Sequence, residues 1–166
     1  MIIGLSGTIG CGKDTVADYL VNIHRFKREA FANSLKEAMS VIFGWEWALL
    51  EGRSKESREW REQVDPWWAK RLNMPELTPR WVLQYVGTEV IRQNFADDMW
   101  IASLENRLRQ RTDNVVITDV RFVNEIKMLK SFKLAFFISP LFSINGNIVF
   151  TLSVKALHLA SFISVL

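Results

Sequence analysis

A phosphate-binding loop is predicted by the stretch GTIGCGKDT, which starts at Gly7 and places Gly12 and Lys13 after four intervening residues. Glycines in such a loop let consecutive backbone N–H groups turn toward a phosphate, and the lysine neutralises charge on the β- and γ-phosphates. The usual pattern continues with serine or threonine, whose hydroxyl holds Mg²⁺. Asp14 stands at that position here, and Thr15 follows it. The residue types therefore predict phosphate binding with an unusual residue at the metal position.

Asp14 has two physical interpretations, and the residues alone leave both open. An acid in the first turn of a helix is favoured there by the helix dipole. Alternatively, the Asp14 carboxylate replaces the missing hydroxyl and touches Mg²⁺ directly or through water, because oxygen ligands suit that hard cation. In either case Thr15 can bond an α-phosphate oxygen.

A second acid, Asp119, closes the β-prone run VVIT in the stretch VVITDVRF. An acid that ends a buried strand is the usual companion of a phosphate loop, where it holds the water shell of the metal. Arg121, two residues further on, can reach a phosphate. A strand-end acid paired with a nearby arginine would give the same pattern without any ligand. The glycine loop upstream favours the functional interpretation.

A strand and a helix are predicted on either side of the glycine loop. Ile2–Ser6 is short, apolar and β-prone, which indicates a buried strand. From Lys13 onward, apolar residues recur at helical spacing, at Val16, Leu20 and Ile23. The loop thus joins a strand to a helix, which is the context that a phosphate loop requires.

Strands alternate with helices along the chain, and this order predicts an α/β fold with a mainly parallel sheet. Further strands are expected at 28–31, 115–118, 134–138 and 148–152, and further helices at about 34–43, 78–90, 97–108 and 123–129. Asn33 or Ser34 is expected to cap the helix near 34–43. Residues 51–73 are mixed in charge and rich in tryptophan, and they predict no definite element. Since ligands bind at the carboxyl ends of parallel strands, Gly7 and Asp119 are expected to face one crevice.

A polar face is predicted on the helix that Thr78 begins. Gln84, Thr88 and Arg92 follow at intervals of four residues and so share one side of an α-helix. A merely solvated face would look the same. Gly87 lies inside this helix, where it costs roughly 1 kcal/mol relative to alanine, and this suggests that something approaches the backbone closely. The glycine therefore favours a functional face.

Composition predicts one soluble globular domain, since 166 residues contain 49% hydrophobic and 23% charged residues. A net charge of +3 fits a protein that handles phosphorylated small molecules better than one that binds nucleic acid. The single cysteine, Cys11, excludes an internal disulfide. The start MIIGLSG lacks the features of a signal peptide, so a cytoplasmic location is expected. Apolar runs fall far short of the ~20 residues that span a bilayer, so no membrane partner is expected.

The last forty residues or so differ in composition from the rest. After Arg121 there is no arginine, and after Glu125 there is no acid. Two segments are therefore expected: a folded domain at 1–130 and an atypical apolar segment at 131–166.

Three motifs together carry a family resemblance: LSGTIGCGKDTVADYL, LQYVGTEVIR and VVITDVRFVNE. In order and approximate spacing they resemble the phage-type deoxynucleoside monophosphate kinases, a branch of the P-loop nucleoside monophosphate kinases. The resemblance covers about residues 1–130. It implies a three-layer α/β/α P-loop fold and Mg²⁺-dependent transfer of the ATP γ-phosphoryl group to a deoxynucleoside 5′-monophosphate (dNMP). If the chain is phage-encoded, this would take place in the host cytoplasm.

The resemblance also implies a role for particular residues. ATP would be held by Gly7, Gly10, Cys11, Gly12, Lys13, Asp14 and Thr15. The dNMP would be bound by Lys36, Gln84, Thr88, Arg92, Trp100, Arg121, Asn124 and Glu125, with Trp100 near the base. Lys13, Asp119 and Arg121 would act in catalysis, and Asp14 and Asp119 would hold Mg²⁺. Members of the family usually continue with a lid that bears arginines, so the end of this chain is expected to be truncated or frame-altered. Arg107, Arg109 and Arg111 could substitute for the lid charges.

Other functions remain open at this stage. A regulatory GTPase would need an Asn-Lys-x-Asp run, which the sequence lacks. A nucleotide-binding protein that has lost catalysis with its lid is a second alternative. A third is another small-molecule kinase on the same fold, of the dephospho-coenzyme A or phosphomevalonate type. The preferred base is not evident from the sequence, and a homodimer is left open.

Overall fold

A computed structural model describes residues 1–8, 11–132, 135–144 and 147–153, the last two ranges as backbone. The chain divides into two compact units, which we call the sheet unit, Met1–Phe31 with Leu104–Leu166, and the helical unit, Ala32–Ser103. The helical unit is therefore an insertion between two parts of the sheet unit. Each unit is described by itself.

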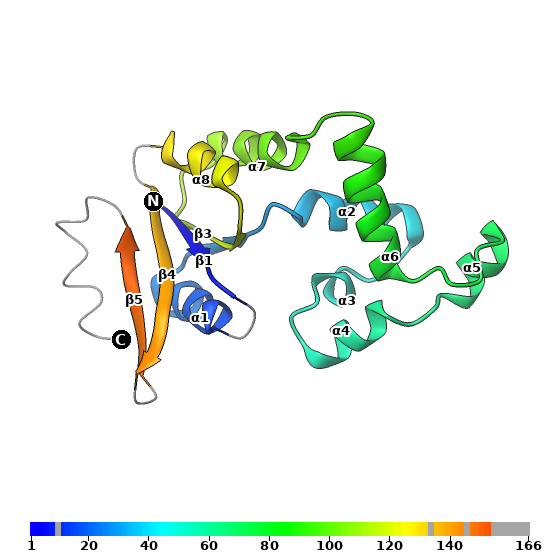
Figure 1. Cartoon of the computed structure of the whole chain (residues 1–166), viewed down its shortest axis with the longest axis horizontal. Helices are drawn as coiled ribbons and strands as arrows, with labels where there is room; N and C mark the ends of the chain where they lie inside the picture. The colour runs from blue at the N-terminus through cyan, green and yellow to red at the C-terminus, as the bar shows by residue number, and fades with distance from the viewer. Residues whose placement is uncertain (9–10, 133–134, 145–146, 154–166) are drawn as a thin grey trace. The chain divides into compact units, whose positions relative to one another are not determined.

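The sheet unit is built on a mainly parallel sheet, as the sequence predicts (Figure 1). Its strands are β1 (Ile2–Ser6), β2 (Lys27–Glu29), β3 (Val115–Val120), β4 (Ala135–Ile144) and β5 (Asn147–Ser153), in the spatial order β2-β3-β1-β4-β5. The first four strands in this list pair in parallel, and β5 pairs antiparallel with β4. β1 is therefore the central strand, with β3 on one side and β4 on the other.

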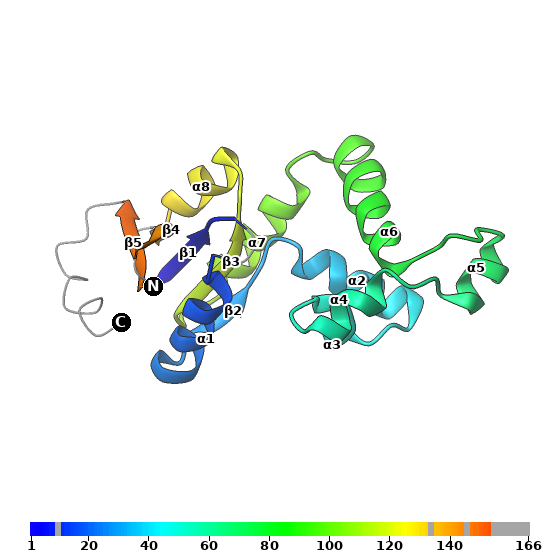
Figure 2. The same ribbon diagram turned by 60° about the horizontal axis from the view of Figure 1, so that its bottom comes forward.

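Helices cover both faces of this sheet. In the two views, α1 (Lys13–His24) lies on one side of β1 and α8 (Val123–Lys130) lies on the other (Figures 1 and 2). A third helix, α7 (Met99–Arg109), leads from the helical unit into the sheet unit. These layers confirm the predicted three-layer α/β/α fold of the P-loop class.

The core between α1 and the sheet consists of apolar side chains from both elements, namely Ile3, Leu5, Val16, Ala17, Leu20, Phe26 and Val116. Ile23 shares the helical spacing of Val16 and Leu20 but does not join this core, because its side chain is 61% exposed. The chain leaves the helix at Arg25, which has a left-handed backbone conformation. Phe26, buried directly after this turn, fills the core in place of Ile23.

The helical unit explains the tryptophan-rich stretch for which the sequence predicted no element. It contains α2 (Asn33–Phe43), α3 (Trp47–Glu51), α4 (Lys55–Arg61), α5 (Pro66–Leu72), α6 (Pro79–Gln84) and the π-helix η1 (Tyr85–Gln93). Trp45 stacks on Phe43 with ring centroids 4.3 Å apart, and its indole donates to Asp65 over 2.7 Å. Trp45 is therefore part of the core, and Trp60 and Trp68 pack against it, whereas Trp67 is 61% exposed.

Capping explains where two of these helices begin. The Thr78 hydroxyl accepts a hydrogen bond of 3.1 Å from Trp81 N, and Pro79 occupies the first turn of α6, as predicted. Asp65 caps α5 in the same way. The predicted cap of α2 is wrong, because that helix already begins at Asn33, with Ala32 at the capping position.

The two ends of the helical unit lie close together. The Oγ atoms of Ser34 in α2 and Ser103 in α7 are 2.8 Å apart. The chain thus leaves the insertion close to the point where it enters it.

The two strands expected after residue 130 are present and longer than predicted, as β4 and β5. Leu134, Lys155 and His158 lie outside the described residues. The boundary at residue 130 stays a prediction, although the β4 backbone extends the same sheet. None of the helices in the described part of the chain combines the length and the apolar character needed to cross a membrane.

Candidate active site

The glycine loop follows β1 and ends at the first turn of α1. Gly7 and Gly12 both have positive φ, +150° and +87°, a region that residues with a side chain rarely adopt. Gly10 lies outside the described residues. The two described glycines therefore have a conformational reason to be glycine, and the loop leads directly to a helix N-terminus, which favours anions.

Lys13 turns its ammonium group back onto this loop. Its Nζ donates to the carbonyl oxygens of Gly7 over 2.8 Å and Thr8 over 2.6 Å, and it lies 3.4 Å from the Cys11 sulfur. A positive charge is thus held against the loop that would receive phosphate, at the positive end of α1.

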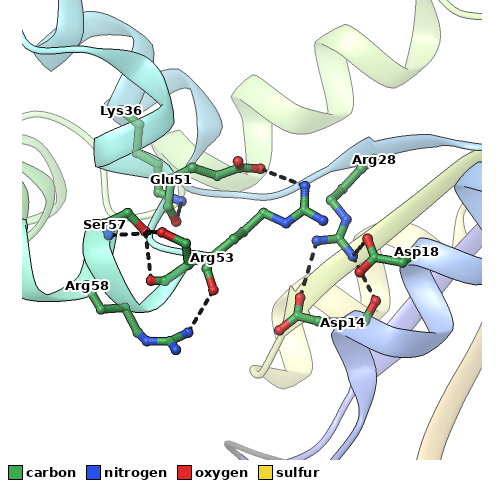
Figure 3. Close-up of polar contacts among 9 residues, drawn as sticks. Asp14, Asp18, Arg28, Lys36, Glu51, Arg53, Ser57 and Arg58 are labelled. Carbon is green, nitrogen blue, oxygen red and sulfur yellow. Dashed lines mark hydrogen bonds and ion pairs between the residues drawn. The ribbon is translucent and has the colours of Figure 1, made fainter.

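Asp14 has a partner that neither interpretation of the sequence foresaw. Its carboxylate Oδ1 is 3.3 Å from Nη1 of Arg28, a residue of β2 (Figure 3). Nη2 of the same guanidinium donates to Asp14 O over 3.1 Å and lies 3.2 Å from Asp18 Oδ1. Asp14 nevertheless remains 75% exposed, so its carboxylate is accessible from solvent.

Asp119 lies in β3 at the carboxyl edge of the sheet, near the start of the glycine loop. Ser6, the residue before Gly7, pairs with Val120, the residue after Asp119. This register supports the expectation that the loop and the acid share one edge. Asp119 Oδ1 accepts a hydrogen bond of 3.0 Å from Phe31 N, so the carboxylate also fixes the segment after β2.

The residues after Asp119 form the beginning of α8. Glu125 is 3% exposed, and its Oε2 accepts hydrogen bonds from Arg121 N at 2.7 Å and Phe122 N at 3.0 Å. A glutamate at the third helical position commonly caps a helix in this way. The structure thus gives Glu125 a capping role, while the Arg121 side chain is exposed. Asn124 is exposed as well, and its Oδ1 accepts from Glu125 N over 3.0 Å.

The polar face predicted in the helical unit continues from α6 into η1. The stretch from Tyr85 is a π-helix and not the α-helix that was predicted. Gln84 and Thr88 are exposed, and Arg92 is half-buried. π-Helical turns occur frequently at functional sites. Val90, also in η1, is exposed.

Gly87 has a close neighbour, as its position inside a helix predicted. The neighbour is a side chain of the protein itself. A Cβ atom at residue 87 would lie 2.8 Å from Cδ2 of Leu35 in α2. On the backbone, the Gly87 carbonyl accepts a 3.0 Å hydrogen bond from the indole of Trp100. Gly87 therefore has a packing reason, and the predicted base-site residue Trp100 is half-buried against the helical core.

Lys36 lies among several charged residues of the helical unit (Figure 3). Its Nζ donates to Glu51 O over 3.2 Å, and the Glu51 carboxylate is 3.7 Å from Arg53 Nη1. Arg58 donates to Arg53 O over 2.8 Å. No sequence motif marks Arg53 and Arg58, although their basic character is visible in the run RSKESR.

The arginines expected to replace a lid have acidic partners instead. The nearly buried Glu29 of β2 accepts from Arg107 Nη2 at 3.3 Å and from Arg111 Nη1 at 2.8 Å. Arg111 also binds Asp113 through two hydrogen bonds, of 2.9 and 2.8 Å. These bonds lower the pKa of Asp113 to about 2. Arg109 pairs with Glu105, so all three arginines have acidic partners within the protein.

A magnesium ion fits the acids of the sheet unit. Residues 1–8 and 11–132 contain no group of three acidic, histidine or cysteine side chains that could hold a metal alone. In phosphoryl-transfer sites Mg²⁺ usually takes only one or two carboxylates, and phosphates and water complete its shell. The exposed Asp14 and the strand-end Asp119 meet this requirement.

Fold and site together define a class of protein. A glycine loop follows β1 of a parallel sheet, Lys13 lies against this loop, and Asp119 lies on β3, the strand beside β1. These features define a P-loop nucleotide-binding protein.

Comparison with known proteins identifies the family within this class. A protein of Acanthamoeba polyphaga mimivirus, named as a deoxynucleotide monophosphate kinase, is 32% identical over 144 residues, covering 78% of this chain and 68% of the relative. The deoxynucleoside-5′-monophosphate kinase of Escherichia phage T5 is 31% identical over 179 residues, covering 78% of this chain and 72% of the relative. No family model matches the chain. The chain belongs to the deoxynucleoside monophosphate kinase family, which confirms the family predicted from its motifs.

Proposed function

We propose that this protein transfers the γ-phosphoryl group of ATP to a dNMP, giving the diphosphate and ADP for deoxynucleotide synthesis. The observation that carries the proposal is the Lys13 ammonium, held by the carbonyls of Gly7 and Thr8 at the start of α1. Two relatives named as kinases of this substrate class support the same function. One relative is encoded by a phage, and we propose the host cytoplasm as the place of action.

On the ATP side, the loop from Gly7 to Thr15 would surround the phosphates. Lys13 offsets the charge of the β- and γ-phosphates, and backbone N–H groups at the start of α1 orient them. Asp14 and Asp119 would hold Mg²⁺, which supplies further positive charge for the transferred group. Such a reaction needs positioning and charge compensation, and no covalent intermediate or strong base.

On the dNMP side, cationic and polar residues would bind the monophosphate and sugar, and Trp100 would lie near the base. The proposed residues are Lys36, Gln84, Thr88, Arg92, Trp100, Arg121, Asn124 and Glu125. Within this set, the buried Glu125 would act by holding the backbone of Arg121, which its carboxylate already binds. Arg121 would then offset the repulsion between the two phosphorylated substrates.

A coupled assay of ADP release tests the proposal. ATP and Mg²⁺ are supplied with dTMP, dGMP, dCMP, dAMP or a 5-modified pyrimidine monophosphate in turn. We expect turnover with one or more of these. Folded protein that binds ATP and turns over none of them would indicate an ATP-binding protein without kinase activity. Turnover of dephospho-coenzyme A or phosphomevalonate alone would indicate a different small-molecule kinase.

A further inference from the structure

Arg28 joins β2 to the first two turns of α1. One guanidinium group contacts the Asp14 carboxylate, the Asp14 carbonyl oxygen and the Asp18 carboxylate, at 3.3, 3.1 and 3.2 Å (Figure 3). Its side chain is 14% exposed, so most of the arginine is buried. Arg28 is therefore fixed beside the residue that stands at the metal position of the loop.

The three contacts divide between the two terminal nitrogens. Nη1 approaches the Asp14 carboxylate, whereas Nη2 contacts the Asp14 carbonyl and Asp18. A planar guanidinium can hold several acceptors in fixed directions. The Nη1 contact can therefore be given up while the Nη2 contacts keep the arginine in place.

Of the Arg28 contacts, the one with the Asp14 carboxylate is also the weakest, because of its exposure to solvent. The Asp14 carboxylate is 75% exposed, and exposed ion pairs contribute little to stability because water screens them. A divalent cation that arrives with bound phosphates carries more charge and prefers carboxylate oxygen. It can therefore compete for the same oxygen that Arg28 Nη1 approaches.

We propose that Arg28 is a positioning residue for the ATP site, which holds Asp14 in the nucleotide-free protein and competes with Mg²⁺ for its carboxylate. This inference rests on the proposed function, in which Asp14 is a ligand of Mg²⁺. When ATP and Mg²⁺ bind, Arg28 gives up the Asp14 carboxylate and keeps Asp18. The arginine thereby sets how strongly ATP binding depends on Mg²⁺.

The test measures the dissociation constant of ATP by calorimetry, once with Mg²⁺ and once with EDTA. The constant in EDTA divided by the constant in Mg²⁺ gives the Mg²⁺ dependence. Arg28→Met removes the competitor, so the ratio should increase about two- to fivefold, a modest factor because water screens the exposed Asp14 carboxylate. Asp18→Asn removes the other carboxylate that Arg28 contacts. The guanidinium then binds Asp14 more strongly, so the ratio should decrease. Asp14→Asn should lower the ratio strongly and abolish the effect of Arg28→Met in the double variant.

The double variant separates competition from a general charge effect. If Arg28→Met changes the ratio equally with Asp14 and with Asn at position 14, the inference is overturned. A change in the same direction for Arg28→Met and Asp18→Asn also overturns it, because both would then act through loss of structure. dNMP turnover is measured separately. Turnover without an Arg28 effect contradicts this inference alone, and an Arg28 effect without turnover contradicts the proposed function alone.

Discussion

At the scale of single residues, Lys13 and Asp14 are held in different ways. The lysine is bound by carbonyl oxygens of its own loop, so the loop that would receive phosphate also places the charge. The aspartate is held by an arginine from another strand. The motif alone could predict the role of Lys13. It could not predict Arg28, because that contact depends on how β2 packs beside α1.

Lys13→Met tests the charge on the loop. The variant keeps the length of the side chain and removes the ammonium group, so kcat/KM for ATP should fall roughly 10²- to 10³-fold, as for other preorganised donors to a developing charge. Steady-state kinetics with saturating dNMP measure the change. Lys70→Met, at an exposed lysine of α5, is the matched control and should behave like the wild type. Near-normal kinetics of Lys13→Met would show that Lys13 does not contact the phosphates.

At the scale of elements, α6 (Pro79–Gln84) and η1 (Tyr85–Gln93) show what periodicity can and cannot predict. The cap at Thr78 and the burial of Val82 follow from residue types that act locally. The change from α-helix to π-helix at Tyr85 does not, because the four-residue spacing of polar side chains fits both. An interior glycine correctly indicated a close approach, yet only the packing of α2 reveals Leu35 as the neighbour.

Gly87→Ala tests this close approach. Alanine gains helix propensity of up to about 1 kcal/mol, whereas its Cβ would meet Leu35 Cδ2 at 2.8 Å. Overpacking in a core typically costs about 1–3 kcal/mol, so we expect a net loss of roughly 1 kcal/mol in unfolding free energy. Chemical denaturation measures it.

The second variant of this test is Leu35→Val, which lacks the Cδ2 atom. Combined with Gly87→Ala it should cost less than the two single changes added together, because the clash is absent. Strict additivity would show that Leu35 is not the obstacle.

The other elements divide in the same way. Strands β1 and β3 and helix α8 follow from apolar runs and β-branched residues, and their bounds lie close to those predicted. The stretch of residues 51–73 was not predictable, because Trp60 and Trp68 pack against residues outside it, Trp45 and Phe43. Asp65 both caps α5 and accepts a hydrogen bond from the Trp45 indole, and no local sequence pattern predicts this double role.

At the scale of the whole molecule, a charge cluster ties distant segments of the sheet unit together. Glu29 of β2 binds Arg107 of α7 and Arg111, and Arg111 binds Asp113 just before β3. Two acids and two arginines balance one another, which reduces the cost of the nearly buried Glu29 carboxylate. The sequence showed the arginines, but their acidic partners become visible only in the fold.

The pKa of Asp113 predicts a pH dependence of stability. Its folded-state pKa of about 2 lies below the ordinary 3.8, so the carboxylate stabilises the fold above pH 3.8, and this contribution is lost as the pH falls toward 2. Asp113→Asn should therefore lower the unfolding midpoint at pH 7 slightly. The difference from the wild type should shrink only as the pH falls below about 4.

Thermal unfolding of both proteins from pH 7 to pH 3 provides the measurement. Asp97→Asn, at an exposed acid in the turn before α7, is the comparison variant. A wild-type advantage over Asp113→Asn that shrinks already between pH 7 and pH 5 would contradict the role of the Arg111–Asp113 pair.

The hydrogen bond between Ser34 and Ser103 has a consequence for how such a protein can change over time. Because the insertion starts and ends at nearly the same place, it can be lengthened, shortened or exchanged without stretching the strands on either side. Chain segments with adjacent ends are the ones that transfer between proteins as modules. The nucleotide loop and its sheet could thus stay constant while the inserted helices diverge to accept a different nucleotide.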